Sequence, residues 1–200
     1  MRLTLVYSGV LHAQSSNDTR NGEKHSIRRK FHEQLKDLWL THPALEGIYE
    51  QWSHLSESEK IAPGKFISAF DLGNYRFIPL VTKNLKLSCE LDILFLRREP
   101  AGYIVDGESA DIDNRIKVLL DALRKPRHPP EIPASVSQPS AGETPFFVFL
   151  EDDSLITRLS VDTDRLLEPL EGSSSDVKLI LRVTVKVIQL SYGNLGLGGN

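Results

Sequence analysis

Cysteine is almost absent from this sequence, since Cys89 is the only one in 200 residues. A single cysteine excludes a disulfide within the chain and a zinc site built from several cysteine thiolates. Long hydrophobic runs are also missing, and no apolar stretch approaches the roughly 20 residues of a membrane-spanning helix. An apolar run at the N-terminus is interrupted by Tyr7, Ser8 and Gly9, which favours a first strand over a signal peptide. We therefore expect a cytoplasmic protein without a membrane partner.

The composition is that of a folded domain. Hydrophobic residues make up 40% of the chain and charged residues 26%, both close to globular averages. The length suits one well-packed domain and is too short to require two. We expect residues 1–190 to form this domain and the glycine-rich residues 191–200 to be a disordered tail.

Positive charge is concentrated in one short stretch, although the chain has a net charge of −3. A protein that binds nucleic acid needs such cations to contact phosphates. The candidate DNA-binding residues are Arg20, Lys24, Arg28, Arg29 and Lys30. A solvated helix face has the same composition, so both interpretations stay open. Four histidines, His25, His32, His42 and His54, follow no metal-ligand pattern and are expected at the surface.

Helical periodicity is clearest in three segments. A polar loop at 14–24 precedes a helix that Ser26 caps, with Ile27, Phe31, Leu35 and Leu38 on one side. Pro43 suits the first turn of a second helix, which runs to Trp52. A third helix is predicted over 114–124. Trp39 and Trp52 fall on apolar stripes and are expected in the core.

Strands are predicted at 3–7, 77–82, 87–96, 146–150, 154–161 and 177–190. The segment 87–96 alternates apolar and polar residues, which predicts one buried face that includes Cys89. The segment 77–82 is its expected partner, and the continuous apolar run at 146–150 predicts a fully buried strand. Residues 125–145 are rich in proline and serine and are expected to be a mobile insertion. Together these elements predict a single α+β domain, a mixed sheet with helices mainly on one face.

Two acidic clusters carry the chemistry of this sequence. Asp111 and Asp113 are two residues apart at the start of a predicted helix, and Lys117 follows one turn later. A second cluster, which includes Asp152 and Asp153, follows the buried strand at 146–150. Carboxylate oxygens at fixed positions are suitable ligands for Mg²⁺. If this strand runs beside the strand that leads to Asp111, the two clusters meet.

Each cluster also has a structural interpretation. Aspartate and asparagine before a helix commonly act as N-caps, which stabilise by roughly 1 kcal/mol. Lys117 can pair with Asp113 or Asp121 on the helix surface, and acidic residues after a strand are typical of a turn. The ordered combination of both clusters is more specific than either one.

The sequence resembles the RusA family of Holliday junction resolvases. The resemblance is carried by Asp111-x-Asp113-Asn114-x-x-Lys117-x-x-x-Asp121-Ala122-Leu123, followed by a hydrophobic strand and Asp152-Asp153. It covers 111–123 and 150–156 at the level of motifs and about 1–190 in the order of elements. The chain departs from the family pattern at 105–110, where family members tend to have a basic run and this chain is acidic or neutral.

The resemblance implies a Mg²⁺-dependent endonuclease that nicks branched DNA as a homodimer in DNA recombination and repair, with Mn²⁺ as a possible substitute. By similarity, the metal-binding catalytic acids are Asp111, Asp113 and Asp153, with Lys117 as the catalytic or phosphate-binding cation. Asn114 and Asp152 would support the site. Two alternatives remain open: a non-catalytic RusA-like DNA-binding protein, and a metal-dependent nuclease that acts on flap, duplex or RNA substrates.

Overall fold

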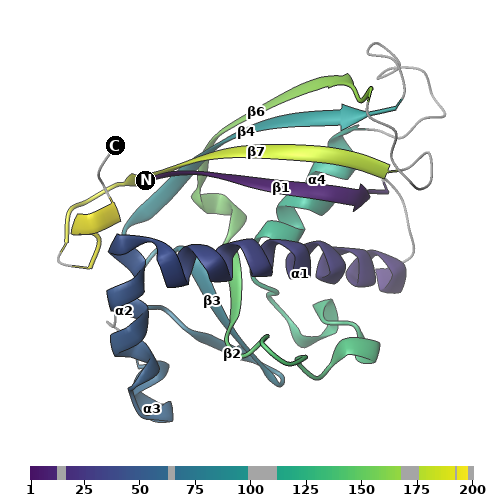
Figure 1. The fold of residues 1–200 in the computed structure, drawn as a ribbon. Coiled ribbons are helices and arrows are strands. Elements are labelled where there is room, and N and C mark those ends of the chain that lie inside the picture. The colour runs from purple at the N-terminus through teal and green to yellow at the C-terminus, as the bar shows by residue number, and fades with distance from the viewer. Residues whose placement is uncertain (13–16, 63–65, 99–111, 168–175, 192, 198–200) are drawn as a thin grey trace.

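The computed structural model describes residues 1–12, 17–62, 66–98, 112–167, 176–191 and 193–197. Within these residues the chain forms a single α+β domain with two sheets, as Figure 1 shows. The helices are α1 (Asn17–Thr41), α2 (Pro43–Ser53), α3 (Glu57–Lys60) and α4 (Ile112–Leu123). The strands are β1 (Arg2–Val10), β2 (Phe70–Leu72), β3 (Tyr75–Val81), β4 (Leu87–Arg97), β5 (Phe146–Leu150), β6 (Ile156–Arg165) and β7 (Asp176–Val187). A short 3-10 helix, η3 (Asp153–Leu155), joins β5 to β6.

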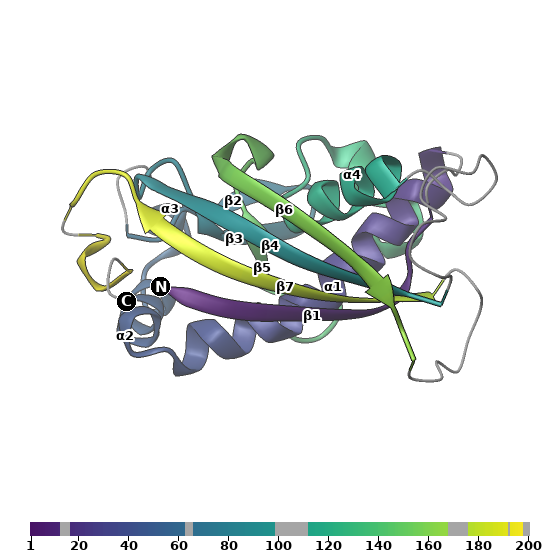
Figure 2. The same ribbon diagram turned by 90° about the horizontal axis from the view of Figure 1, so that it is seen from above.

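The larger sheet has four strands in the order β1-β7-β4-β6. Strand β7 is antiparallel to both of its neighbours, whereas β6 is parallel to β4, so the sheet is mixed. Side chains alternate between a buried and an exposed face, with Leu5 and Leu181 inward and Thr4 and Arg182 outward. Figure 2 shows α1 and α4 beneath this sheet, which agrees with the prediction that helices cover one face.

The smaller sheet has the order β2-β3-β5, and it corrects the predicted strand pairing. Segment 77–82 was expected to pair with 87–96, but β3 pairs with β2 and β5 instead. The reason is burial: β5 is buried on both faces and so is most of β3, which suits a parallel pair inside the protein. Strand β4 keeps one partly exposed face and pairs with β6 and β7.

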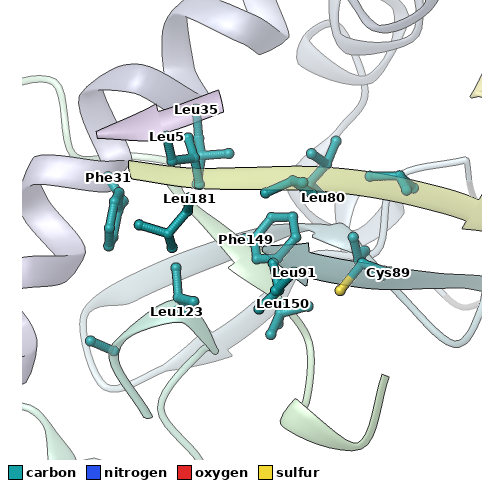
Figure 3. Close-up of a cluster of buried hydrophobic side chains, with 14 of the residues drawn as sticks. Leu5, Phe31, Leu35, Leu80, Cys89, Leu91, Leu123, Phe149, Leu150 and Leu181 are labelled. Atoms are coloured by element: carbon teal, nitrogen blue, oxygen red, sulfur yellow. The ribbon is translucent and has the colours of Figure 1, made fainter. Parts of the chain in front are cut away.

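The main core lies between the larger sheet, α1 and the smaller sheet. Phe31 and Leu35 of α1 pack among Leu5 of β1, Leu181 of β7 and Phe149 of β5 (Figure 3). The predicted apolar stripe of this helix is therefore confirmed. The predicted burial of Trp39, Trp52 and Cys89 is confirmed as well.

Helix α1 begins at Asn17, nine residues before the predicted cap at Ser26. Residues in the added turns make tertiary contacts that periodicity does not reveal. Lys24 is buried and pairs with Asp121 of α4 at 2.7 Å. His25 is also buried, and its ring lies 5.5 Å from the ring of Tyr75 on β3. These contacts hold the extension helical in place of the expected polar loop.

The proline- and serine-rich segment 125–145 packs against the smaller sheet, which differs from the mobile insertion expected from sequence. It covers a second apolar cluster made of Tyr75, Phe77, Phe146 and Val148, to which its Ile132 contributes. The Tyr75 hydroxyl donates a hydrogen bond to the carbonyl of Val136 at 2.7 Å, and Glu143 pairs with Arg29 at 2.6 Å. The segment thus supplies the second layer that this sheet requires.

The C-terminal tail also differs from its predicted disorder over 193–197. Asn194 and Leu197 are buried, and the Asn194 amide donates to the carbonyls of Leu85 and Gln189 at 2.7 and 2.8 Å. The amino group of Met1 donates to the Leu197 carbonyl at 2.9 Å. This part of the tail therefore belongs to the folded domain.

Strand β1 lies at the edge of the larger sheet, and α1 covers part of that edge. The Gln34 side chain accepts a hydrogen bond from the Val6 N–H at 2.9 Å and donates one to the Val6 carbonyl at 2.7 Å. The ammonium group of Lys30 donates to the carbonyl of Ser8 further along the same edge. Side chains thus take the place of a neighbouring strand.

Two histidines expected at the surface, His25 and His32, are buried between α1 and the smaller sheet. His32 Nδ1 accepts the Phe147 backbone N–H at 2.9 Å, so its Nε2 carries the proton and donates to the Gly142 carbonyl at 3.1 Å. The ring is therefore neutral. Burial lowers the pKa of His32 and lowers that of His25 to about 4.

Because these two histidines are buried in their neutral form, we expect the free energy of unfolding to decrease at acidic pH. An unfolded histidine titrates near pH 6.5, so the unfolded state binds protons first as the pH falls. The stability present above pH 6.5 should be lost between about pH 6.5 and the lower pKa of the folded protein, by on the order of 3 kcal/mol for His25. Urea denaturation across this range measures the loss. His25→Phe should flatten the profile, and the exposed His128→Gln should leave it unchanged; an equal profile in all three proteins would contradict the assignment.

Candidate functional site

The first turns of α4 present two of the predicted site residues to solvent. Asp113 and Lys117 are exposed and lie one helical turn apart, and Asn114 is half-buried between them. The opposite side of the helix buries Ile116 and Leu119 in the main core, which fixes the orientation of the exposed face. Asp111 lies outside the described residues.

The second acidic cluster forms an ordered turn at the end of β5. Glu151 accepts a hydrogen bond from the Lys83 backbone N–H at 2.9 Å, which ties the turn to the connection between β3 and β4. Asp152 caps η3 by accepting the Ser154 N–H at 3.1 Å. Asp153 is the first residue of η3, and its side chain is 38% exposed. Of the three acids, Asp153 has the carboxylate that backbone contacts constrain least.

An arginine that the sequence did not indicate contacts the acids of this turn. Arg127 Nη2 contacts the Asp152 carboxylate at 3.0 Å and the Asp153 carboxylate at 2.8 Å. Hydrogen bonds from Ser154, together with Arg127, hold the pKa of Asp152 well below its usual range. Arg127 belongs to the Lys-Pro-Arg run that follows α4. Because it is far from the acids in sequence, the sequence did not indicate this contact.

The acidic turn lies alongside the C-terminal part of α4. The Lys125 N–H, just after the helix, donates to the Leu150 carbonyl at 2.9 Å, and η3 itself contacts α4. Asp113 lies at the other end of the helix, and the ten residues from Asp113 to Leu123 rise about 15 Å along its axis. The structure thus brings Asp152 and Asp153 together with Arg127, and it places Asp113 with Lys117.

The route by which the two clusters were expected to meet is wrong. The sequence suggested that the strand at 146–150 runs beside the strand leading to Asp111, which is β4. Strand β5 pairs with β3 in the smaller sheet instead. The turn after β5 reaches the start of β4 through β6, where Ile156 lies opposite Cys89. Contact between α4 and η3, not strand pairing, links the two regions.

No group of three histidine, cysteine, aspartate or glutamate side chains among the described residues could hold a metal ion. The predicted metal-binding triad includes Asp111 and so extends beyond them.

The basic candidates divide into internal and external residues. Arg28 is buried and donates to the carbonyls of Asp121 and Arg124, and Lys24 pairs with Asp121. These two cations connect α1 to α4 and are not available to a phosphate. Arg29 pairs with Glu143 but is only half-buried, Arg20 is half-buried, and Lys30 is exposed. The structure therefore removes the two most buried cations from the predicted DNA-binding face.

Comparison with protein-family models, curated proteins and solved structures finds no match for this chain. The RusA resemblance therefore rests on the two sequence motifs. None of the helices among the described residues is both long and apolar enough to span a membrane.

Arg127 provides a test of the acidic turn as a cation site. Arg127→Gln should raise the affinity for Mn²⁺ or Tb³⁺ by about twofold to fivefold, because an exposed ion pair worth up to about 1 kcal/mol no longer competes. Isothermal titration or Tb³⁺ luminescence measures the change. Arg76 is a matched control, since it also bridges two carboxylates, those of Asp71 and Glu57. An equal gain in Arg76→Gln, or no gain in Arg127→Gln, rules out a cation site at this turn.

Proposed function

We propose that this chain is a Mg²⁺-dependent endonuclease that nicks branched DNA, as its motif-level resemblance to the RusA family implies. In this proposal Asp111, Asp113 and Asp153 hold the metal, Lys117 faces the scissile phosphate, and Asn114 and Asp152 support the ligands. The proposal rests on the two sequence motifs, which lie on elements that contact each other, since α4 bears Asp113 and η3 bears Asp153. Because this contact is at the end of α4 opposite Asp113, the proposal requires the start of α4 and the acidic turn to come together around the ion. Asp113 is exposed and the Asp153 side chain is 38% exposed, so a metal ion can reach both carboxylates from solvent.

The donor set fits the proposed ion. Mg²⁺ prefers carboxylate oxygens and usually binds one or two of them, with water and substrate phosphate completing its coordination. When bound, the ion would supply Lewis-acid stabilisation of the phosphate and lower the pKa of a water. Lys117, one turn after Asp113, would offset negative charge that develops on the phosphate. A homodimer would supply the two symmetric sites that paired nicks require.

The proposal predicts that Asp113→Asn lowers cleavage of a four-way junction by more than about 100-fold, because even outer partners of metal ligands cost 10- to 100-fold. Asp153→Asn should have the same effect if both carboxylates share the ion. Asp162→Asn removes an exposed acid from β6 and should cut as the parent does. The measurement is the initial rate of nicking in Mg²⁺ on a denaturing gel. Parental rates in Asp113→Asn refute the role of that residue.

Removal of the metal gives an independent prediction. EDTA should abolish nicking, and Mg²⁺ or Mn²⁺ should restore it, because the ligands alone provide no Lewis acid. Junction, flap, linear duplex and RNA substrates compared in parallel identify the substrate. Nicking that persists in EDTA contradicts a metal-dependent mechanism.

The second candidate is a non-catalytic RusA-like DNA-binding protein. The ion pairs of Arg127 with Asp152 and Asp153 favour it, since they give these acids a purely structural role at the turn. This candidate predicts junction binding in EDTA with no nicking in either Mg²⁺ or Mn²⁺.

A further inference from the structure

The outer face of the larger sheet carries a hollow that the proposed site does not use. Its cavity volume is about 570 Å³, and its walls come from β1, β4, β6 and β7. The lining includes four cationic side chains, Arg2, Arg158, Arg182 and Lys186, and two carboxylates, Glu90 and Asp92. The helices lie beneath the opposite face of this sheet (Figure 2), so the hollow opens away from them.

The carboxylates neutralise only part of this positive charge. Asp92 pairs with Arg158 at 2.7 Å, and Glu90 pairs with Lys186. Among the ion pairs of the described residues, none involves Arg2 or Arg182. The hollow therefore has two positive charges in excess on a chain whose net charge is −3. This local excess attracts an anion.

Strand register places the two unpaired arginines close together. Arg182 on β7 lies opposite Thr4, and Arg2 lies opposite Thr184, so the two arginines are diagonal neighbours on one face. Diagonal neighbours of this kind are roughly 7–8 Å apart, within reach of one extended anion. The threonine hydroxyls beside them are further donors that phosphate oxygens accept.

The hollow lies at the end of the sheet where the acidic turn is found. Strand β6 begins at Ile156, which lies opposite Cys89 of β4. Arg158, two residues after Ile156, lies opposite Glu90. Asp153 precedes Arg158 by five residues, which span at most about 18 Å of extended chain. An extended polyanion can therefore occupy the hollow and continue toward η3.

The lining favours binding of a nucleic-acid phosphate backbone over binding of exposed bases. Outward-facing residues of the four described strands include no aromatic ring, so bases have no stacking platform on this face. Proteins that hold unpaired single strands usually supply such platforms. Arginine and threonine side chains instead bind the phosphates of a duplex without reading its sequence.

We propose that this hollow, through Arg2 and Arg182, binds the phosphate backbone of a DNA duplex arm. The inference deepens the proposed function, on which it rests, by assigning the substrate contact to the sheet face and not to α1. Arg158 and Lys186 remain paired with carboxylates and add to the surrounding positive potential.

The test measures binding of a fluorescent four-way junction and a linear duplex in EDTA by anisotropy, over a series of salt concentrations. The double variant Arg2→Gln/Arg182→Gln should weaken binding about tenfold at low salt and reduce the slope of log K against log salt by about 2, since each phosphate contact contributes close to one. Asp92→Asn should tighten binding severalfold, because it removes one of the two carboxylates that pair with Arg158 and adds to the excess charge. A general loss of folding cannot explain why one substitution tightens DNA binding and another on the same surface weakens it. Thermal melts verify that each variant is folded.

Lys36→Gln is the matched control, because it removes one positive charge from α1, on the other side of the sheet. It should bind as the parent does. The inference is overturned if the parent binds neither DNA, if the double arginine variant binds as the parent does, or if Lys36→Gln weakens binding as much as the double arginine variant does. Arginine-dependent binding without Mg²⁺-dependent nicking supports this inference and refutes the nuclease. Nicking that depends on Asp113 but not on the arginines supports the proposed nuclease and refutes this inference.

Discussion

The position of α4 depends on a buried guanidinium group. Arg28 on α1 donates to the carbonyls of Asp121 and Arg124 at 2.9 and 3.1 Å, where the last turn of α4 leaves such groups without partners. Lys24 adds an ion pair to the Asp121 side chain. Positive charge at a helix C-terminus is also favoured by the helix dipole. Every exposed residue of α4, including Asp113 and Lys117, is oriented by this attachment to α1.

The segment after α4 connects this attachment to the rest of the molecule. Its Glu131 pairs with Arg124, its Arg127 reaches the acids after β5, and its Ile132 packs on the smaller sheet. Proline-rich composition suggested an independent excursion, yet the same residues bury aromatic side chains and balance charge. The acidic turn is therefore held from two directions, by the buried strand that precedes it and by an arginine from a separate part of the chain.

Periodicity predicted those elements whose environment is uniform along their length. Strand β5 and the apolar stripe of α1 were predicted correctly, because a continuous or regularly spaced apolar pattern can bury its apolar side chains in only one way. The early turns of α1 were missed because Lys24 is charged, and local sequence does not show that a distant carboxylate, that of Asp121, would pair with it in a buried position. The division into two sheets was missed for a similar reason, since partner choice depends on contacts between remote strands. The candidate motif residues were proposed from their spacing, whereas Arg127 was not, because its contacts with the acids span 25 residues or more.

The amide of Gln34 on the outer edge of β1 has a consequence for association. An edge strand with unsatisfied backbone groups can template another chain, and repeated addition produces open-ended filaments. One glutamine occupies both backbone groups of Val6, and Lys30 occupies the carbonyl two residues on. Growth by strand addition along this edge is thereby blocked at its centre, so β1 does not offer a continuous template to another chain.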